Sequence, residues 1–180
     1  MCSKISIKNL NSTVTIDKGE LISFIVDKIE YIHQKGNKGW RKSDDEMFPI
    51  IGPISKNNFK VHTKKGDATQ DQHGLLRELD YKLISLNKSS VKFRKTYKKG
   101  TKVKNSKFPK KSTEELLHWP FDFSFEKNYT LNNNILNIEF VIHSEKGMPF
   151  MLGYHPAFLL STTGNETLLA NYTKITLKDI

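Results

Sequence analysis

The chain has 180 residues, of which 37% are hydrophobic and 11% aromatic, so it can form one domain with a buried core and is not a disordered chain. No apolar run approaches the roughly 18 residues that a membrane-spanning helix requires. Residues 1–10 lack the apolar segment of a secretory signal. The only cysteine is Cys2, which excludes an intramolecular disulfide and a cysteine-based zinc site. These features predict a reduced, cytoplasmic protein with no membrane contact.

The net charge of +10 comes from one block of the chain. Residues 81–113 contain twelve lysines and arginines and no acidic residue, which leaves 17 basic and 19 acidic residues elsewhere. Because like charges at this density repel one another and cannot be buried unpaired, the block predicts an exposed loop around Lys98–Gly100. It also leaves open a polyanion binder that uses residues 82–111 and stacks bases on Phe93, Tyr97 and Phe108. A lysine run between strands is more often a solvated loop, so no nucleic-acid partner is expected.

Short alternating runs predict antiparallel strands from the start of the chain. The first three cover residues 4–10, 13–16 and 21–26, and a fourth covers residues 29–34. A Gly-rich and charge-rich loop is expected over residues 35–45.

The second half of the chain shows two hairpin patterns. Residues 78–86 and 90–97 flank a turn at Asn87-Lys88-Ser89, and residues 121–131 and 135–143 flank Asn132-Asn133-Asn134. The only segment with a helical signal is Ser112–Leu117, whose start resembles a capped first turn. The sequence therefore predicts an all-β fold, most simply a large antiparallel sandwich with little helix.

Four short motifs follow one another in order between about residue 20 and residue 160. They are Glu30–Gln34 with Trp40 and Met47–Pro53; Gln72–Arg77; Trp119–Phe123 with Tyr129–Leu131; and Met148–Phe150 with Gly153–Phe158. In this order and spacing the motifs resemble the aldose 1-epimerase (galactose mutarotase) family, and its LacX-like branch best. The resemblance implies a galactose mutarotase-like β-sandwich, or supersandwich. It also implies that residues 1–180 are one domain, the N-terminal part of a longer family domain.

The resemblance implies a ring-opening reaction on a hexose, which interconverts the α and β anomers. Opening a cyclic hemiacetal needs a base for the C1 hydroxyl proton and an acid for the ring oxygen. The family likeness assigns the acid to His155, places His73 near the substrate oxygens as a second catalytic and binding residue, and gives Arg77 a substrate-binding role. We therefore expect His73 and His155 to face one cleft, within the span of a monosaccharide, about 10 Å.

Other conspicuous residues have plainer interpretations. The remaining histidines are expected at the surface or at strand edges, and Trp119 with the alternating phenylalanines of residues 121–125 is expected in the core rather than as a sugar platform. No metal site is predicted, because the histidines and carboxylates do not cluster at ligand spacing, and no cofactor is implied. One departure from the family pattern is Pro53, which stands where the family commonly has a substrate-contacting arginine.

The expected partner is a monosaccharide, a hexose or a hexose phosphate, and self-association through an uncovered sheet edge is a further expectation. Two alternatives to the epimerase remain open. One is a non-catalytic carbohydrate-binding or degenerate member of the family, and the other is the polyanion binder.

The resemblance also generates a prediction about activity. The family's general base is a glutamate on a late strand, whereas only 24 residues follow Pro156, and neither Glu166 nor Asp179 has a matching context. Losing one acid–base partner commonly costs about 10²–10⁴-fold in rate. Polarimetry on freshly dissolved α-glucose or α-galactose should therefore show little or no mutarotation by the 180-residue chain. Strong catalysis that Glu166→Gln abolishes would place the base in this chain instead.

Overall fold

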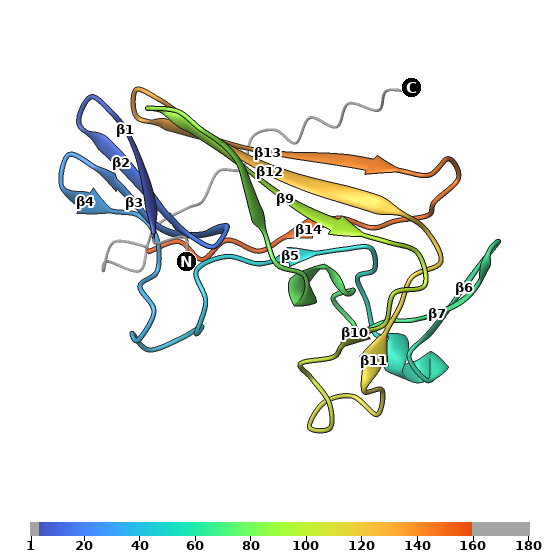
Figure 1. Cartoon of the computed structure of the whole chain (residues 1–180). Helices are drawn as coiled ribbons and strands as arrows, with labels where there is room; N and C mark the ends of the chain where they lie inside the picture. Colours follow the sequence, from blue (N-terminus) through green and yellow to red (C-terminus); the bar gives the residue numbers. More distant parts are fainter. Residues whose placement is uncertain (1–3, 160–180) are drawn as a thin grey trace.

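The computed structural model describes residues 4–159, which form two four-stranded antiparallel sheets and several short strand pairs (Figure 1). The smaller sheet is built from consecutive strands in the order β1-β2-β3-β4. Its strands are β1 (Ile5–Asn9), β2 (Ser12–Asp17), β3 (Glu20–Val26) and β4 (Ile29–Glu30). The three alternating runs predicted at the start of the chain are thus confirmed. The predicted strand over residues 29–34 is shorter than expected, because only Ile29–Glu30 pairs with β3.

The larger sheet has the strand order β13-β12-β9-β8. Its strands are β8 (Lys82–Leu86), β9 (Ser90–Tyr97), β12 (Phe123–Asn132) and β13 (Ile135–Ser144). Both predicted hairpins are confirmed, with turns at residues 87–89 and 133–134. Alternate residues of β12 are fully buried, as expected for a sheet that packs on one face.

Three two-stranded pairs and two single 3₁₀ turns complete the described part of the chain. The pairs join β5 (Glu46–Met47) to β14 (Gly153–Tyr154), β6 (Lys60–Thr63) to β7 (Gly66–Thr69), and β10 (Val103–Lys104) to β11 (Leu116–Leu117). The 3₁₀ turns are η1 (Ile54–Asn57) and η2 (Leu76–Glu78). The β5–β14 ribbon runs along the underside of the large sheet (Figure 1).

The apolar core consists of two clusters along one face of the large sheet. One lies between this sheet and the strands β1–β4, and includes Ile7, Val14, Phe93 and Leu131. The other surrounds Trp119 and contains the side chains predicted for the core, Phe121, Phe123 and Phe125, all at most 3% exposed. The prediction that these aromatic side chains belong to the core is therefore confirmed.

Buried charges lie between the two apolar clusters. Lys127, on β12, is completely buried, and its ammonium group donates to Asp44 and Glu46 beside and within β5. The hydroxyl groups of Tyr129 and Tyr154 donate to the same Asp44 carboxylate. The two carboxylates raise the pKa of Lys127 well above its usual value, even though burial alone would lower that pKa. The network ties the β5–β14 ribbon to the large sheet.

One expectation from the sequence is wrong and another is confirmed. Residues 112–117 form no helix: Ser112 does accept the Glu114 N–H through its hydroxyl, but Leu116–Leu117 pairs with β10 and Leu117 is fully buried. The tertiary contact of Leu117 outweighs the local capping signal. The exposed loop expected around Lys98–Gly100 is confirmed, because all three residues are exposed at the turn that follows β9, whereas Lys95, within β9, is only 6% exposed.

No helix within residues 4–159 is long and apolar enough to cross a membrane. Glu166 and Asp179, the acidic residues considered as bases, lie outside the described residues.

The buried network predicts a large difference between two lysine substitutions. Lys127→Ala leaves two carboxylates buried without their cation, which should cost about 3–5 kcal/mol in the free energy of unfolding. Lys35→Ala is the matched control, because its pair with Glu20 is half-exposed at 2.6 Å and should contribute about 1 kcal/mol or less. Urea denaturation followed by tryptophan fluorescence measures both. Similar losses from the two variants would show that the buried network does not hold the ribbon.

Candidate functional site

The two motif histidines are attached to one short stretch of backbone, residues 45–48. His155 and Asp45 exchange both backbone hydrogen bonds, at 2.9 and 3.2 Å, and the Phe48 N–H donates to the His73 carbonyl at 3.2 Å. Three residues of extended chain span about 10 Å. The structure therefore brings the backbones of His73 and His155 together although 82 positions separate them. The expected distance between their rings stays a prediction.

The direction of the side chains follows from the alternation of an extended chain. Asp44, Glu46 and Phe48 face the large sheet, where they contact Lys127 or the aromatic core. Asp45 must therefore point away from the sheet, as does His155, its directly opposed partner. The candidate site lies on this outer side of the ribbon.

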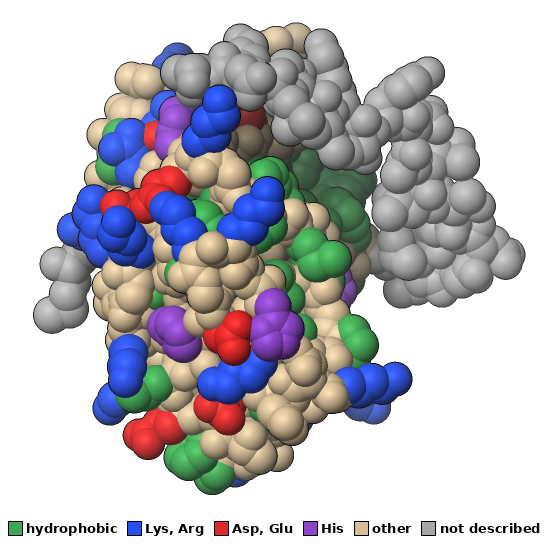
Figure 2. All heavy atoms as spheres, turned by 90° about the vertical axis from the view of Figure 1, so that its right-hand side faces the viewer, with side chains coloured by type: hydrophobic (Ala, Val, Ile, Leu, Met, Phe, Trp, Pro, Cys, Tyr) green, Lys and Arg blue, Asp and Glu red, His purple; other side chains and the backbone are tan. Residues whose placement is uncertain are grey.

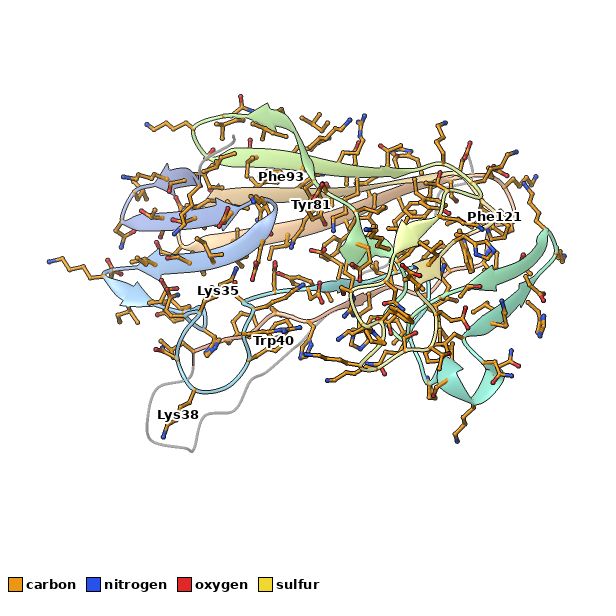
Figure 3. The ribbon with its side chains drawn as sticks, turned by 60° about the horizontal axis from the view of Figure 1, so that its bottom comes forward. Lys35, Lys38, Trp40, Tyr81, Phe93 and Phe121 are labelled. Carbon is orange, nitrogen blue, oxygen red and sulfur yellow. The ribbon has the colours of Figure 1, made fainter. Side chains whose placement is uncertain are left out.

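Trp40 adds an aromatic wall beside His155. The two rings are stacked with centroids 4.8 Å apart, and His33 Nε2 forms a hydrogen bond of 2.7 Å with the Trp40 carbonyl. In Figure 3, Lys38 points away from the molecule at the tip of its loop, whereas Trp40 turns back toward the strands. His33, expected at the surface, is thus a half-buried residue that fixes the backbone of Trp40.

Arg77 occupies the centre of the site and lacks full hydrogen bonding. Its side chain is 8% exposed and lies 3.9 Å from Asp45 and 4.0 Å from Asp71. These distances are ion pairs but exceed hydrogen-bond length. The Nε and Nη2 atoms have no hydrogen-bond partner among the described residues. A buried guanidinium with free donors is suited to bind an oxygen-rich ligand.

His73 is half-buried beside this arginine. Burial, and then the charge of Arg77, lowers the pKa of His73, while Asp71 and Asp45 partly oppose the effect. His73 is therefore neutral at pH 7, with one ring nitrogen able to accept a hydrogen bond. The next residue, Gly74, has a φ of +71°, and a Cβ atom there would lie 2.1 Å from the Phe48 carbonyl oxygen. Only glycine allows the His73 segment to approach β5 this closely.

A polar pocket of about 620 Å³ adjoins the site. Asp45, Arg77, Tyr81 and Lys95 contribute to its lining, whereas neither motif histidine does. Sequence reasoning found Arg77 but missed Asp45, Tyr81 and Lys95. The acidic run Asp44-Asp45-Glu46 directly before the Phe-Pro motif is the one signal that could have drawn attention to this segment.

Lys95 is a buried cation without a matching anion. Its ammonium donates to the Leu76 carbonyl at 2.9 Å and lies 4.2 Å from the centre of the Tyr81 ring. Among residues 4–159, no carboxylate lies within salt-bridge distance of it. Burial lowers the pKa of Lys95 to about 8, although Glu46 acts in the opposite direction. Tyr81 also has a buried hydroxyl without a partner among the described residues; Figure 3 shows its ring close to Phe93.

The sequence profile of the aldose 1-epimerase family matches residues 19–179. The chain belongs to the aldose 1-epimerase family. Protein LacX (chromosomal) from Lactococcus lactis subsp. lactis is 27% identical over 164 residues, which cover 86% of this chain and 50% of LacX. The chain thus spans about half the length of the curated relatives it matches.

Two solved structures show the same fold. A galactose mutarotase related enzyme from Lactobacillus acidophilus has a TM-score of 0.69 and 26% identity, over 92% of this chain and 52% of that protein. A galactose mutarotase-like protein from Lactobacillus casei has a TM-score of 0.69 and 25% identity, over 90% and 52%. The likeness to these structures confirms the all-β, galactose mutarotase-like fold. The match to LacX confirms the relation to LacX proposed from the motifs.

The close approach at Gly74 gives a prediction with a matched control. Gly74→Ala and Gly100→Ala both place a side chain at a positive φ, which costs roughly 1–2 kcal/mol. Only at Gly74 does the new methyl group meet backbone atoms, since nothing lies within 4 Å of a Cβ at Gly100. Overpacking should add about 1–3 kcal/mol to the loss of unfolding free energy. Equal losses of unfolding free energy for the two variants in urea denaturation would contradict the close approach of Gly74 to the Phe48 carbonyl.

Lys95 predicts a pH dependence of stability. Its folded pKa of about 8 is below the unfolded value of about 10.5, so between these values the unfolded chain binds more protons and stability rises with pH. The gain from pH 8 to pH 10 should be about 2 kcal/mol. Above pH 10 the raised pKa values of Tyr81 and Tyr129 oppose it. Urea denaturation of Lys95→Met should lack the wild-type rise, and a parallel pH profile would refute the assignment.

Proposed function

We propose that this chain carries the substrate-binding half of an aldose 1-epimerase that opens and recloses hexose rings. The observation that supports the proposal best is the arrangement around Asp45. His155 is paired with it through the backbone, Arg77 lies 3.9 Å from it, and the Asp45 charge acts on His73. The proposal is thus supported by the closeness of the three motif residues to Asp45, which His155 reaches through the backbone and Arg77 through an ion pair.

The residues fit the chemistry that ring opening requires. His155 is exposed and stacked on Trp40, so its ring has a fixed plane and can be reached by a sugar; it would protonate the ring oxygen. His73 is neutral, and it would accept a hydrogen bond from a sugar hydroxyl or donate one to a developing alkoxide. The free Nε and Nη2 donors of Arg77 would bind sugar oxygens.

A non-catalytic carbohydrate-binding protein is the second candidate. It is favoured by Pro53, which is exposed and provides no cation where the family commonly has arginine. The outer side of the ribbon would then bind a sugar without converting it.

One experiment separates the two candidates. Hexose binding is measured by saturation-transfer NMR, and anomer exchange of the same sugar by exchange spectroscopy at high protein concentration. In an epimerase, a weak exchange rate above the uncatalysed one should fall at least about 100-fold or to background in His155→Asn, while binding persists. Binding with no excess exchange would favour the non-catalytic protein. If the hexose does not bind and no exchange is detected, both candidates are wrong.

His62→Asn provides the control, because His62 is an exposed histidine on β6 whose ring pairs with Asp67 at 2.7 Å. It should leave both hexose binding and anomer exchange unchanged. A fall in exchange similar to that of His155→Asn would point to a general effect of losing a histidine.

A further inference from the structure

The motif residues assign an acid for ring opening but no base within residues 4–159. Taking the proton of the C1 hydroxyl requires a proton acceptor, and a carboxylate is suited to this role. The ring oxygen and the hydroxyl oxygen are bonded to the same carbon, C1. The acid and the base must therefore reach two neighbouring oxygens, and a base that acts with His155 should lie directly beside it.

Asp45 meets this requirement of position. It lies opposite His155 in the β5–β14 ribbon, where the two residues exchange both backbone hydrogen bonds. Side chains of directly opposed residues project from the same face of an antiparallel pair, with Cβ atoms about 4.5–5.5 Å apart. Each side chain has a different partner, since the His155 ring stacks on Trp40 and the Asp45 carboxylate pairs with Lys42. The two groups do not occupy each other, so one ligand can contact both.

One oxygen of Asp45 is available to a ligand. Its Oδ1 accepts a hydrogen bond of 3.2 Å from the Lys42 ammonium. Its Oδ2 lies 3.9 Å from Arg77 Nη2, which exceeds hydrogen-bond length, and accepts no hydrogen bond from the part of the chain that the structure describes. The side chain is 13% exposed and lines the polar pocket. Oδ2 can therefore accept a hydrogen bond from a sugar hydroxyl.

The other carboxylates nearby are less suited to the role. Asp44 and Glu46 face the opposite side of the ribbon, where both accept hydrogen bonds from the buried Lys127. The side chain of Asp71 is only 3% exposed. Glu20 already accepts three hydrogen bonds. Asp45 is thus the carboxylate that a sugar beside His155 can reach.

A second pair of opposed histidine and aspartate residues provides a comparison. His62 and Asp67 face each other in the β6–β7 ribbon. This ribbon lies at the end of the molecule that Figure 2 faces, where histidine and acidic side chains adjoin. The His62 ring and the Asp67 carboxylate hydrogen-bond each other at 2.7 Å, and both are exposed. The same register therefore gives a closed pair in β6–β7, whereas separate partners hold His155 and Asp45.

We propose that Asp45 is the general base that acts with His155 as the acid. Asp45 Oδ2 takes the proton of the C1 hydroxyl, and the electrons of the broken O–H bond form the C1=O double bond. The bond between C1 and the ring oxygen breaks, and its electrons pass to the ring oxygen, which takes a proton from protonated His155. Rotation about the C1–C2 bond and the reverse steps give the other anomer and restore both residues.

This inference rests on the proposed function and adds the base that the reaction needs. The weak anomer exchange expected of the chain would use this pair. Asp45→Asn tests it, because asparagine keeps the shape and can hydrogen-bond a sugar but cannot take the proton. Exchange above the uncatalysed rate should fall at least about 100-fold or to background, while hexose binding persists.

Asp67→Asn is the matched control, because it removes the carboxylate of the other directly opposed pair. It should leave both hexose binding and anomer exchange unchanged. A similar fall in exchange for Asp67→Asn would show that the loss does not depend on the position beside His155, and would overturn the assignment.

Chemical rescue separates a base from a structural role. Asp45→Ala leaves a space beside His155 that formate can enter, so added formate should restore part of the lost exchange in proportion to its concentration. Asp45→Asn fills the same space and should not recover. Because carboxylates catalyse mutarotation in solution, the rate at the same formate concentration without protein is subtracted. No recovery of Asp45→Ala would indicate a structural role and overturn the assignment.

The remaining outcomes separate failure of the base from failure of the proposed function. Exchange that persists in Asp45→Asn overturns the role of Asp45 and leaves the proposed function intact. Loss of hexose binding in this variant makes Asp45 a binding residue and not the base. Hexose binding by the unaltered chain without any excess exchange overturns the base and favours the non-catalytic protein. Neither hexose binding nor exchange overturns both proposals.

Discussion

The buried ion network of Lys127 is the interaction on which the site depends. Its ammonium group holds Asp44 and Glu46, two carboxylates that flank Asp45 in the chain. Because an extended chain alternates its side chains, fixing these two inward fixes Asp45 outward. Asp45 then pairs with His155 through the backbone, and Phe48, three residues on, pairs with His73. One buried cation thus sets the position of both motif histidines.

Attaching a ribbon to a sheet through buried ions carries a large desolvation cost. Apolar side chains of similar volume would often be as stabilising, because removing charges from water opposes the attraction between them. The network does, however, specify register, since a shift of one residue would replace Asp44 and Glu46 with Asp45 at the buried ammonium. The apolar clusters on either side tolerate small shifts better than paired charges do. We infer that the network maintains the register that places Asp45 at the site.

The sequence predicted the fold better than the site. Alternation of apolar residues identified the three strands at the start of the chain and the hairpins β8–β9 and β12–β13, since period-two burial is a local property of the chain. The prediction of a helix at Ser112–Leu117 was wrong because a capping pattern contains no information on the tertiary pairing that buries Leu117. The burial of Lys95 was missed for another reason. Its strand alternates, and Lys95 lies on the same face as the buried Val91 and Phe93, but the basic block suggested a solvated lysine.

The site was predictable only where a motif carried it. His73, Arg77 and His155 come from the family likeness, and the structure brings their backbones or charges to one carboxylate. Asp45 could not be identified from the sequence, because its importance depends on which of three consecutive acidic residues points outward. That choice is made by Lys127, 82 positions away, and no local pattern contains it.

Two cations beside the pocket remain incompletely compensated, and this distinguishes the site from a purely structural cluster. Lys127 has two carboxylates within hydrogen-bond reach, whereas Lys95 has only a carbonyl and an aromatic ring, and Arg77 has carboxylates at 3.9 and 4.0 Å. Unmatched buried charge lowers stability, and proteins retain it mainly where a ligand completes the hydrogen bonding. Both cations line the same pocket of about 620 Å³, but Asp44, Asp45 and Glu46 line it as well. The unfilled donors of Arg77 therefore call for the oxygen atoms of a ligand and not for further negative charge. A neutral hexose would supply such oxygens without adding charge to a pocket whose lining already contains both signs.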